Sequence, residues 1–198
     1  MVTLKILITE KTSVTEQKFI LPGRYTWQQF KAIQGIIEKA SGLKISYLDG
    51  VIEFMTLGEA HEIIKTIIGS LLEQYFLEKN IEFTAVGSAT RASETKQVSF
   101  EPDESYYLGE KKANPDLAIE VALTSGGKSK LEKYKRLGIA EVWFWENNQL
   151  SVYHFRGEEY EEVSNSELLP ELDLELLVRC VQMPSQLEGM KEFRNNIR

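Results

Sequence analysis

The sequence of 198 residues is poor in the residue types on which several kinds of active site depend. Its one cysteine, Cys180, has no partner for an intrachain disulfide or a cysteine-based metal site, and its apolar neighbours predict an inert packing role. The two histidines, His61 and His154, leave little for a catalytic triad. Patterns for a phosphate-binding glycine loop, a zinc-binding HExxH helix and a nucleophile elbow are absent, so we do not expect those chemistries.

Long apolar runs are also missing. No stretch approaches the roughly 20 apolar residues that a membrane-spanning helix needs, and residues 1–8 lack the apolar core of a signal peptide. There is no internal repeat and no long linker rich in proline, glycine or serine. We therefore expect a cytoplasmic protein with no membrane partner and one main domain.

Positive charge is in deficit, and the net charge of −7 opposes general binding to nucleic acid. The charges are unevenly distributed, however. Residues 125–138 carry five cations against one acid, whereas residues 141–175 carry ten acids against one arginine. The first segment is either a basic patch that faces DNA or the solvated face of a helix, and the sequence leaves both interpretations open.

The content of 42% hydrophobic residues is typical of a globular domain with a packed core. Apolar periodicity and turn residues predict helices at 27–41, 59–79, 128–137 and 174–181, and strands at 4–8, 17–21, 44–48, 51–55, 81–86, 89–92, 97–101, 117–122, 141–145, 150–155 and 159–163. The first two strands would form an N-terminal hairpin, and Asp49-Gly50 predicts a type I′ turn. The strand, helix and strand within 117–145 predict a parallel pair. The fold class is therefore α/β (α+β), with a central mixed β-sheet flanked by helices.

Two carboxylates stand out as candidate metal ligands. Asp103 lies two residues after the end of a predicted strand, and Glu120 lies within an apolar strand, where an unpaired carboxylate would be costly to bury. Strand alternation places Ala118, Glu120 and Ala122 on one face, where the small alanines leave room for a metal ion and a phosphate. Mg²⁺ is a hard cation that one or two carboxylates hold. The pair therefore predicts divalent-metal chemistry on a phosphodiester, with a lysine within reach.

Several motifs occur in order along the chain. They are His61-Glu62 on a helix, Pro102-Asp103, Pro115-Asp116-Leu117-x-x-Glu120-Val121-x-x-x-Ser125, Lys130-x-x-x-Tyr134-x-x-x-Gly138-x-x-Glu141-Val142-Trp143 and Leu169-Pro170-Glu171-Leu172-Asp173-Leu174. Together they resemble the Uma2 family over residues 27–181. This resemblance implies a restriction-endonuclease-like core of the PD-(D/E)xK type and a metal-dependent DNA endonuclease, with Mg²⁺ or Mn²⁺ as cofactor and DNA as partner.

The resemblance implies that Asp103 and Glu120 bind the metal. The lysine that usually follows the glutamate by two residues is absent, because Ala122 stands there. Lys130, four residues before Tyr134, matches a lysine that members of the family often carry on the next helix. The resemblance therefore implies that Lys130 is the catalytic cation, and a solvated helix position is the alternative.

Each remaining candidate residue has a structural alternative. The resemblance implies a glutamate from the first core helix, for which Glu62 is the nearest residue, although helical periodicity points it away from the apolar stripe. His61 lies at the edge of that stripe and is either a catalytic proton-transfer group or a hydrogen-bonded structural residue. Lys128 and Lys133 are further candidates for the cation. Arg91 either contacts phosphate or caps a strand end.

We predict three segments: an N-terminal extension at 1–25, a restriction-endonuclease-like domain at 26–182 and a tail at 183–198. A homodimer would suit a nuclease that cuts both DNA strands. The alternative is a catalytically inactive interaction module that keeps the fold and dimerises through exposed aromatics such as Trp143 and Trp145. The missing lysine and the acidic charge favour this module, whereas Glu120 within an apolar strand favours the nuclease.

Overall fold

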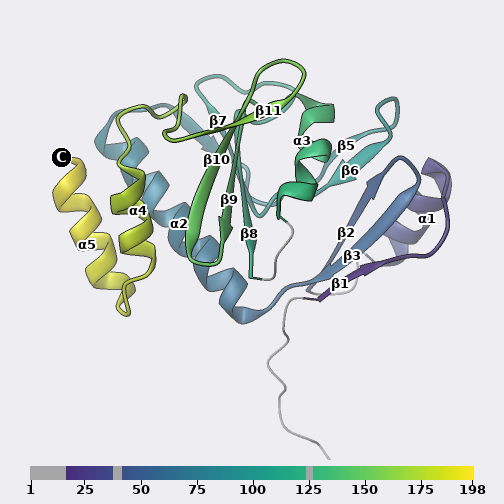
Figure 1. The fold of residues 1–198 in the computed structure, drawn as a ribbon, viewed down its shortest axis with the longest axis horizontal. Coiled ribbons are helices and arrows are strands. Elements are labelled where there is room, and N and C mark those ends of the chain that lie inside the picture. Colours follow the sequence, from purple (N-terminus) through teal and green to yellow (C-terminus); the bar gives the residue numbers. More distant parts are fainter. Residues whose placement is uncertain (1–16, 38–41, 124–126) are drawn as a thin grey trace, which may run out of the picture.

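The computed structural model describes residues 17–37, 42–123 and 127–198. In these ranges the chain forms two β-sheets and five α-helices, an α+β arrangement that confirms the predicted fold class (Figure 1). The larger sheet has the order β11-β10-β9-β8-β7-β4, with strands β4 (Phe83–Ala85), β7 (Glu104–Leu108), β8 (Leu117–Ala122), β9 (Glu141–Glu146), β10 (Gln149–Phe155) and β11 (Tyr160–Val163). The smaller sheet has the order β1-β3-β2-β6-β5, with strands β1 (Gln17–Ile20), β2 (Leu43–Leu48), β3 (Val51–Thr56), β5 (Arg91–Ser93) and β6 (Val98–Phe100).

The helices cover both faces of the larger sheet and one face of the smaller sheet (Figure 1). One face of the larger sheet packs against α2 (Glu59–Glu78), α4 (Leu174–Val181) and α5 (Gln186–Ile197). The other face packs against α3 (Leu131–Leu137), which follows the 3₁₀ turn η1 (Gly127–Lys130). Helix α1 (Trp27–Ile37) packs on the smaller sheet. No helix in the described ranges has the length and apolarity that crossing a membrane requires.

Strand β8 lies inside the larger sheet, and both of its faces are covered. Leu117, Ile119 and Val121 pack in the core beneath α2, whereas Ala118 packs on the opposite side with Tyr134 of α3. This confirms the alternation predicted from the sequence and turns Glu120 toward α3. The pairing of β8 with β9 is parallel, as the strand–helix–strand order predicts.

The β2–β3 hairpin forms one wall of the space next to β8. Its turn has positive φ values of 47° at Asp49 and 86° at Gly50, which agrees with the predicted type I′ turn. In the antiparallel register Lys44 lies opposite Met55 and Ser46 lies opposite Glu53, which places these four side chains on one face. That face is turned toward β8 and α3, and the other face packs on α1.

Trp143 and Trp145 do not form an exposed aromatic patch. They are 0% and 2% exposed, because β9 lies between β8 and β10 and its side chains pack beneath the helical layer. The expectation that these two aromatics are exposed and mediate dimerisation was therefore wrong. A strand inside a sheet that is covered on both faces has no solvent-exposed side.

Other differences from the predicted elements concern the chain ends and one strand. Strand β7 was not predicted, and residues 183–198, expected as a tail, include α5. This helix begins after Ser185, whose side chain accepts a hydrogen bond from Glu188 N, and it buries Phe193. The predicted strand at 4–8 and the predicted end of the first helix at 38–41 lie outside the described residues.

Candidate active site

The structure places Asp103 directly beside Glu120. The backbone N–H of Asp103 donates to Ile119 O at 3.1 Å, and the Oδ2 atom of Asp103 accepts from Val121 N at 2.7 Å. These two bonds go to the residues on either side of Glu120 in β8. Asp103 is fully buried and Glu120 is 3% exposed, so both carboxylates lie in a region of low solvent access.

Three further groups surround the Asp103 carboxylate. His61 Nε2 lies 3.0 Å from Oδ2, Lys44 Nζ lies 2.6 Å from Oδ1, and Lys130 acts on the carboxylate through space. Burial raises the pKa of Asp103, but the hydrogen bond from His61 and the charges of Lys44 and Lys130 outweigh it, so the pKa is well below its usual range. Asp103 is therefore ionised. Because a carboxylate only accepts hydrogen bonds, the proton of the His61 ring lies on Nε2.

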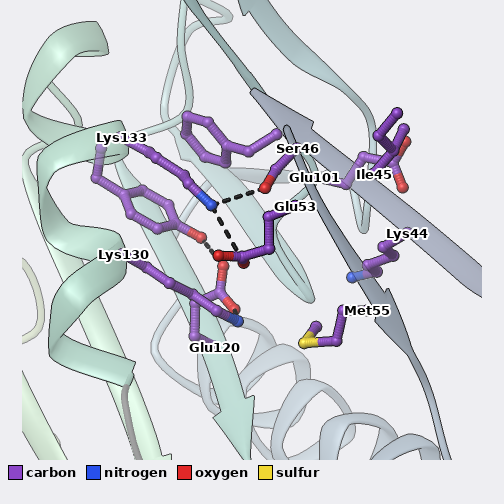
Figure 2. A pocket seen from close by; sticks show the side chains of 11 residues that line it. Lys44, Ile45, Ser46, Glu53, Met55, Glu101, Glu120, Lys130 and Lys133 are labelled. Atoms are coloured by element: carbon purple, nitrogen blue, oxygen red, sulfur yellow. Dashed lines mark hydrogen bonds and ion pairs between the residues drawn. The ribbon is translucent and has the colours of Figure 1, made fainter. Parts of the chain in front are cut away.

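The Glu120 carboxylate is held by two groups from η1 and α3 (Figure 2). Lys130 Nζ lies 2.5 Å from Oε2, and the Tyr134 hydroxyl donates to Oε1. Burial and the neighbouring charge of Glu120 raise the pKa of Tyr134 well above its usual value, so the hydroxyl stays a neutral donor. The spacing of four residues between Lys130 and Tyr134 places both side chains on one side of the helical turn.

A cavity of about 30 Å³ lies between the β2–β3 hairpin and Glu120 (Figure 2). Its polar lining consists mainly of Lys44, Ser46, Glu53, Glu120, Lys130 and Lys133. Lys133 Nζ lies 2.7 Å from Ser46 Oγ and 3.4 Å from Glu53 Oε1. Burial of the Lys133 side chain lowers its pKa, and the negative charge of Glu53 partly offsets this effect. The space is large enough for one or two water molecules.

The other predicted site residues differ in their distance from this cluster. His61 is fully buried against Asp103, deeper than the edge position that helical periodicity predicts, because Asp103 lies beneath the first turn of α2. Glu62 has a side chain that is 45% exposed; it pairs with Lys65 at 2.7 Å, and its Oε1 atom lies 3.5 Å from His61 Nδ1 at the edge of the cluster. Arg91 donates to the Tyr107 hydroxyl at 3.0 Å. The side chain of Lys128 lies outside the described residues.

Sequence reasoning missed Lys44 and Glu53. The alternation along the hairpin shows that Lys44 and Ser46 share a face with Glu53 and Met55, and this signal was available. It does not show which face is turned to Asp103, because that depends on the pairing of β2 with β6, which is distant in sequence.

The donor set at this site fits a hard divalent cation. Within residues 17–37, 42–123 and 127–198, no three His, Cys, Asp or Glu side chains are grouped so that they could hold a metal ion. A cation held here by Asp103 and Glu120 would therefore have no third protein ligand of these types among the described residues. Mg²⁺ commonly binds through one or two carboxylates and completes its shell with water and substrate phosphate. Each of the two carboxylates also has an oxygen that faces an ammonium group, which shows that positive charge is favoured there.

Comparison with known families identifies the type of fold. The family model described as "Uma2: Putative restriction endonuclease" matches residues 27–185, which is most of the chain. The chain belongs to the Uma2 family. The two-sheet core of this Uma2 protein is consistent with the restriction-endonuclease-like fold. No curated protein matches the chain.

Proposed function

We propose that this Uma2 protein is a metal-dependent endonuclease that hydrolyses phosphodiester bonds in DNA. The supporting observation is that two buried carboxylates, Asp103 and Glu120, are each approached by a lysine ammonium group, and that Asp103 bonds to the backbone of the residues on either side of Glu120. Burying two charged carboxylates is costly unless they are paired or bind a cation. Binding of a divalent cation by the carboxylates and of a phosphate by the lysines would account for these buried charges.

Asp103 and Glu120 would hold Mg²⁺ or Mn²⁺ in this proposal. When bound, the cation neutralises charge on the scissile phosphate and lowers the pKa of an attacking water. His61 keeps Asp103 ionised and fixes its orientation, and the hydrogen bond from the Tyr134 hydroxyl orients the Glu120 carboxylate. Lys130 is placed to stabilise the negative charge that develops on the phosphate.

DNA is the proposed partner, although the net charge of the chain is −7. Lys18, Lys44, Lys130 and Lys133 lie around the site and place local positive charge where a phosphate backbone would come. A homodimer related by a two-fold axis would bring two such sites to the two strands. If supercoiled plasmid is converted to linear DNA without first accumulating nicked circles, both strands are cut in one binding event, which would support cutting by a dimer.

Replacement of His61 by alanine is expected to lower Mn²⁺ affinity about 10-fold to 100-fold, which is the usual cost of removing a partner that orients a metal-binding carboxylate. Glu59→Ala is the matched control, since Glu59 lies in the same first turn of α2 but is exposed to solvent. Calorimetric titration with MnCl₂ measures the Mn²⁺ affinity of the variant and of the control. Equal affinities in the two variants would show that His61 does not support the metal ligands.

The test of the proposed function is cleavage of supercoiled plasmid in Mg²⁺, Mn²⁺ or EDTA. The wild type is expected to nick or cut the plasmid with either metal and to lose all activity in EDTA. The Asp103→Ala and Glu120→Ala variants, purified in parallel with the wild type, are expected not to cut, which excludes a contaminating nuclease. A folded wild type that leaves plasmid, single-stranded DNA and RNA intact in both metals would refute the proposal.

A non-catalytic interaction module is the second candidate function. It is favoured by the internal pairing of both carboxylates, since Asp103 bonds to His61 and Lys44, and Glu120 bonds to Lys130 and Tyr134. In this alternative the four contacts only stabilise the fold. Calorimetry separates the two candidates, because the module would not bind Mn²⁺ at Asp103 and Glu120.

A further inference from the structure

The positive charge that phosphodiester hydrolysis needs does not come from β8 itself. Two residues after Glu120 the strand carries Ala122, which has no charge. Two lysines from other elements contact the carboxylates instead: Lys130 of η1 pairs with Glu120, and Lys44 of β2 pairs with Asp103. We propose that Lys44 is a second catalytic lysine, which contacts the phosphate of the DNA strand to be cut; this inference rests on the proposed nuclease function.

The hairpin register holds Lys44 on the wall that faces the site. Lys44 and Ser46 point to the same side of β2, and their cross-strand partners Met55 and Glu53 line the same cavity. A slip of one residue would turn all four side chains away. Strand β2 also pairs with β6, and β6 leads within three residues to Asp103. The position of Lys44 is therefore set by two strand pairings.

The ammonium group of Lys44 keeps a donor for a ligand. It donates to Asp103 Oδ1 at 2.6 Å and to Pro102 O at 3.1 Å. An ammonium group has three N–H donors, and these acceptors account for two of them in the part of the chain that the structure describes. The Lys44 side chain is 14% exposed, whereas Asp103 is fully buried. The third donor can therefore reach a phosphate oxygen that approaches from solvent.

The cavity is too small to hold the phosphate group of a DNA strand, so the lining residues that solvent reaches are the ones that could contact it. About 30 Å³ accommodates one or two water molecules. The phosphate group of a DNA strand is larger than a water molecule and is linked to two sugars, so it would stop where the cavity opens. Lys44 and Lys130 both line the cavity and the side chain of each is 14% exposed, so solvent reaches both ammonium groups.

The structural alternative is that Lys44 only neutralises Asp103. Asp103 already accepts hydrogen bonds from His61 Nε2 and Val121 N, so its charge is stabilised by groups other than Lys44. A divalent cation bound to a carboxylate oxygen would repel an ammonium group that contacts the same oxygen, because both carry positive charge. Cation binding at Asp103 Oδ1 would therefore release Lys44 for the negatively charged phosphate.

The experiment compares Lys44→Met and Lys44→Arg with the wild type and with Lys65→Met. Lys65 is the matched control, because it acts on Asp103 only through space and pairs with Glu62 at 2.7 Å. Cleavage of supercoiled plasmid gives the rate, MnCl₂ titration by calorimetry gives the metal affinity, and thermal unfolding reports whether each variant is folded.

We expect Lys44→Met to cut roughly 100-fold more slowly, the loss typical of removing one group that stabilises transition-state charge. Its Mn²⁺ affinity should equal or exceed that of the wild type, because an ammonium that competes for Asp103 is gone. Lys44→Arg should recover part of the rate, and Lys65→Met should match the wild type in both readouts.

Two results would overturn the role of Lys44 while leaving the nuclease intact. One is a wild type that cuts and a folded Lys44→Met variant that cuts equally fast. The other is a Lys44→Met variant whose slower cutting is matched by weaker Mn²⁺ binding, which a structural support of Asp103 would produce. A wild type that does not cut would instead refute the proposed function, and the role of Lys44 with it.

Discussion

Glu120→Gln is expected to lower the rate of plasmid cleavage by about 100-fold to 1,000-fold, since the substitution removes charge at the centre of the site and keeps the shape of the side chain. The amide oxygen can still accept from the Tyr134 hydroxyl, so the local packing is retained. Lys130 loses its charged partner, and a cation loses one of its two carboxylate ligands. Cleavage rates at saturating Mg²⁺, with circular dichroism as a check of folding, measure the effect.

Glu101→Gln is the matched control for this substitution. Glu101 lines the same cavity, but its carboxylate accepts from the Thr90 hydroxyl at 3.2 Å and is bonded to neither lysine of the site. We expect its cleavage rate to stay within a few-fold of the wild type. Equal losses in the two variants would show that Glu120 acts through general charge and not as a specific ligand.

Glu141→Ala is expected to produce the largest loss of stability, at least about 3 kcal/mol in the free energy of unfolding, because several buried donors lose their acceptor at once and each costs about 1–3 kcal/mol. Glu141 is fully buried and accepts from Trp143 Nε1 at 2.9 Å, Ser166 Oγ at 2.7 Å and Glu167 N at 2.6 Å. These bonds tie the segment after β11 to the larger sheet. Urea unfolding measures the change.

Glu159→Ala controls for the loss of a negative charge in this acidic part of the chain. The Glu159 side chain is 79% exposed and pairs with Lys135 at the surface, where ion pairs contribute little. Its unfolding midpoint should match the wild type. A Glu141→Ala variant as stable as this control would show that the buried hydrogen bonds are replaced by water or by local rearrangement.

The parts of the fold that depend on local pattern were predictable from the sequence. The alternation in β8 separates Leu117, Ile119 and Val121 from Glu120, and the structure shows the same division. The helical phase of α2 predicts an outward Glu62, which agrees with its exposed side chain. Asp49-Gly50 predicts the turn of the hairpin because both residues tolerate positive φ.

The parts that depend on long-range packing were not predictable in this way. Lys44 meets Asp103 across 59 positions of sequence, and no local pattern indicates that contact. The burial of Trp143 and Trp145 follows from the two layers that cover β9, which a single strand does not reveal. Helix α5 differs, because the pair Ser185 and Glu188 fits a helix start and was overlooked.

The most direct measurement is anomalous diffraction from crystals of the wild type soaked in MnCl₂. We predict a manganese peak in contact with an oxygen of Asp103 and an oxygen of Glu120, with the ammonium groups of Lys44 and Lys130 displaced from those oxygens. A structure without manganese at these two carboxylates, in which both lysine pairs persist at a MnCl₂ concentration that saturates the protein in solution, would contradict a metal-dependent site built on Asp103 and Glu120.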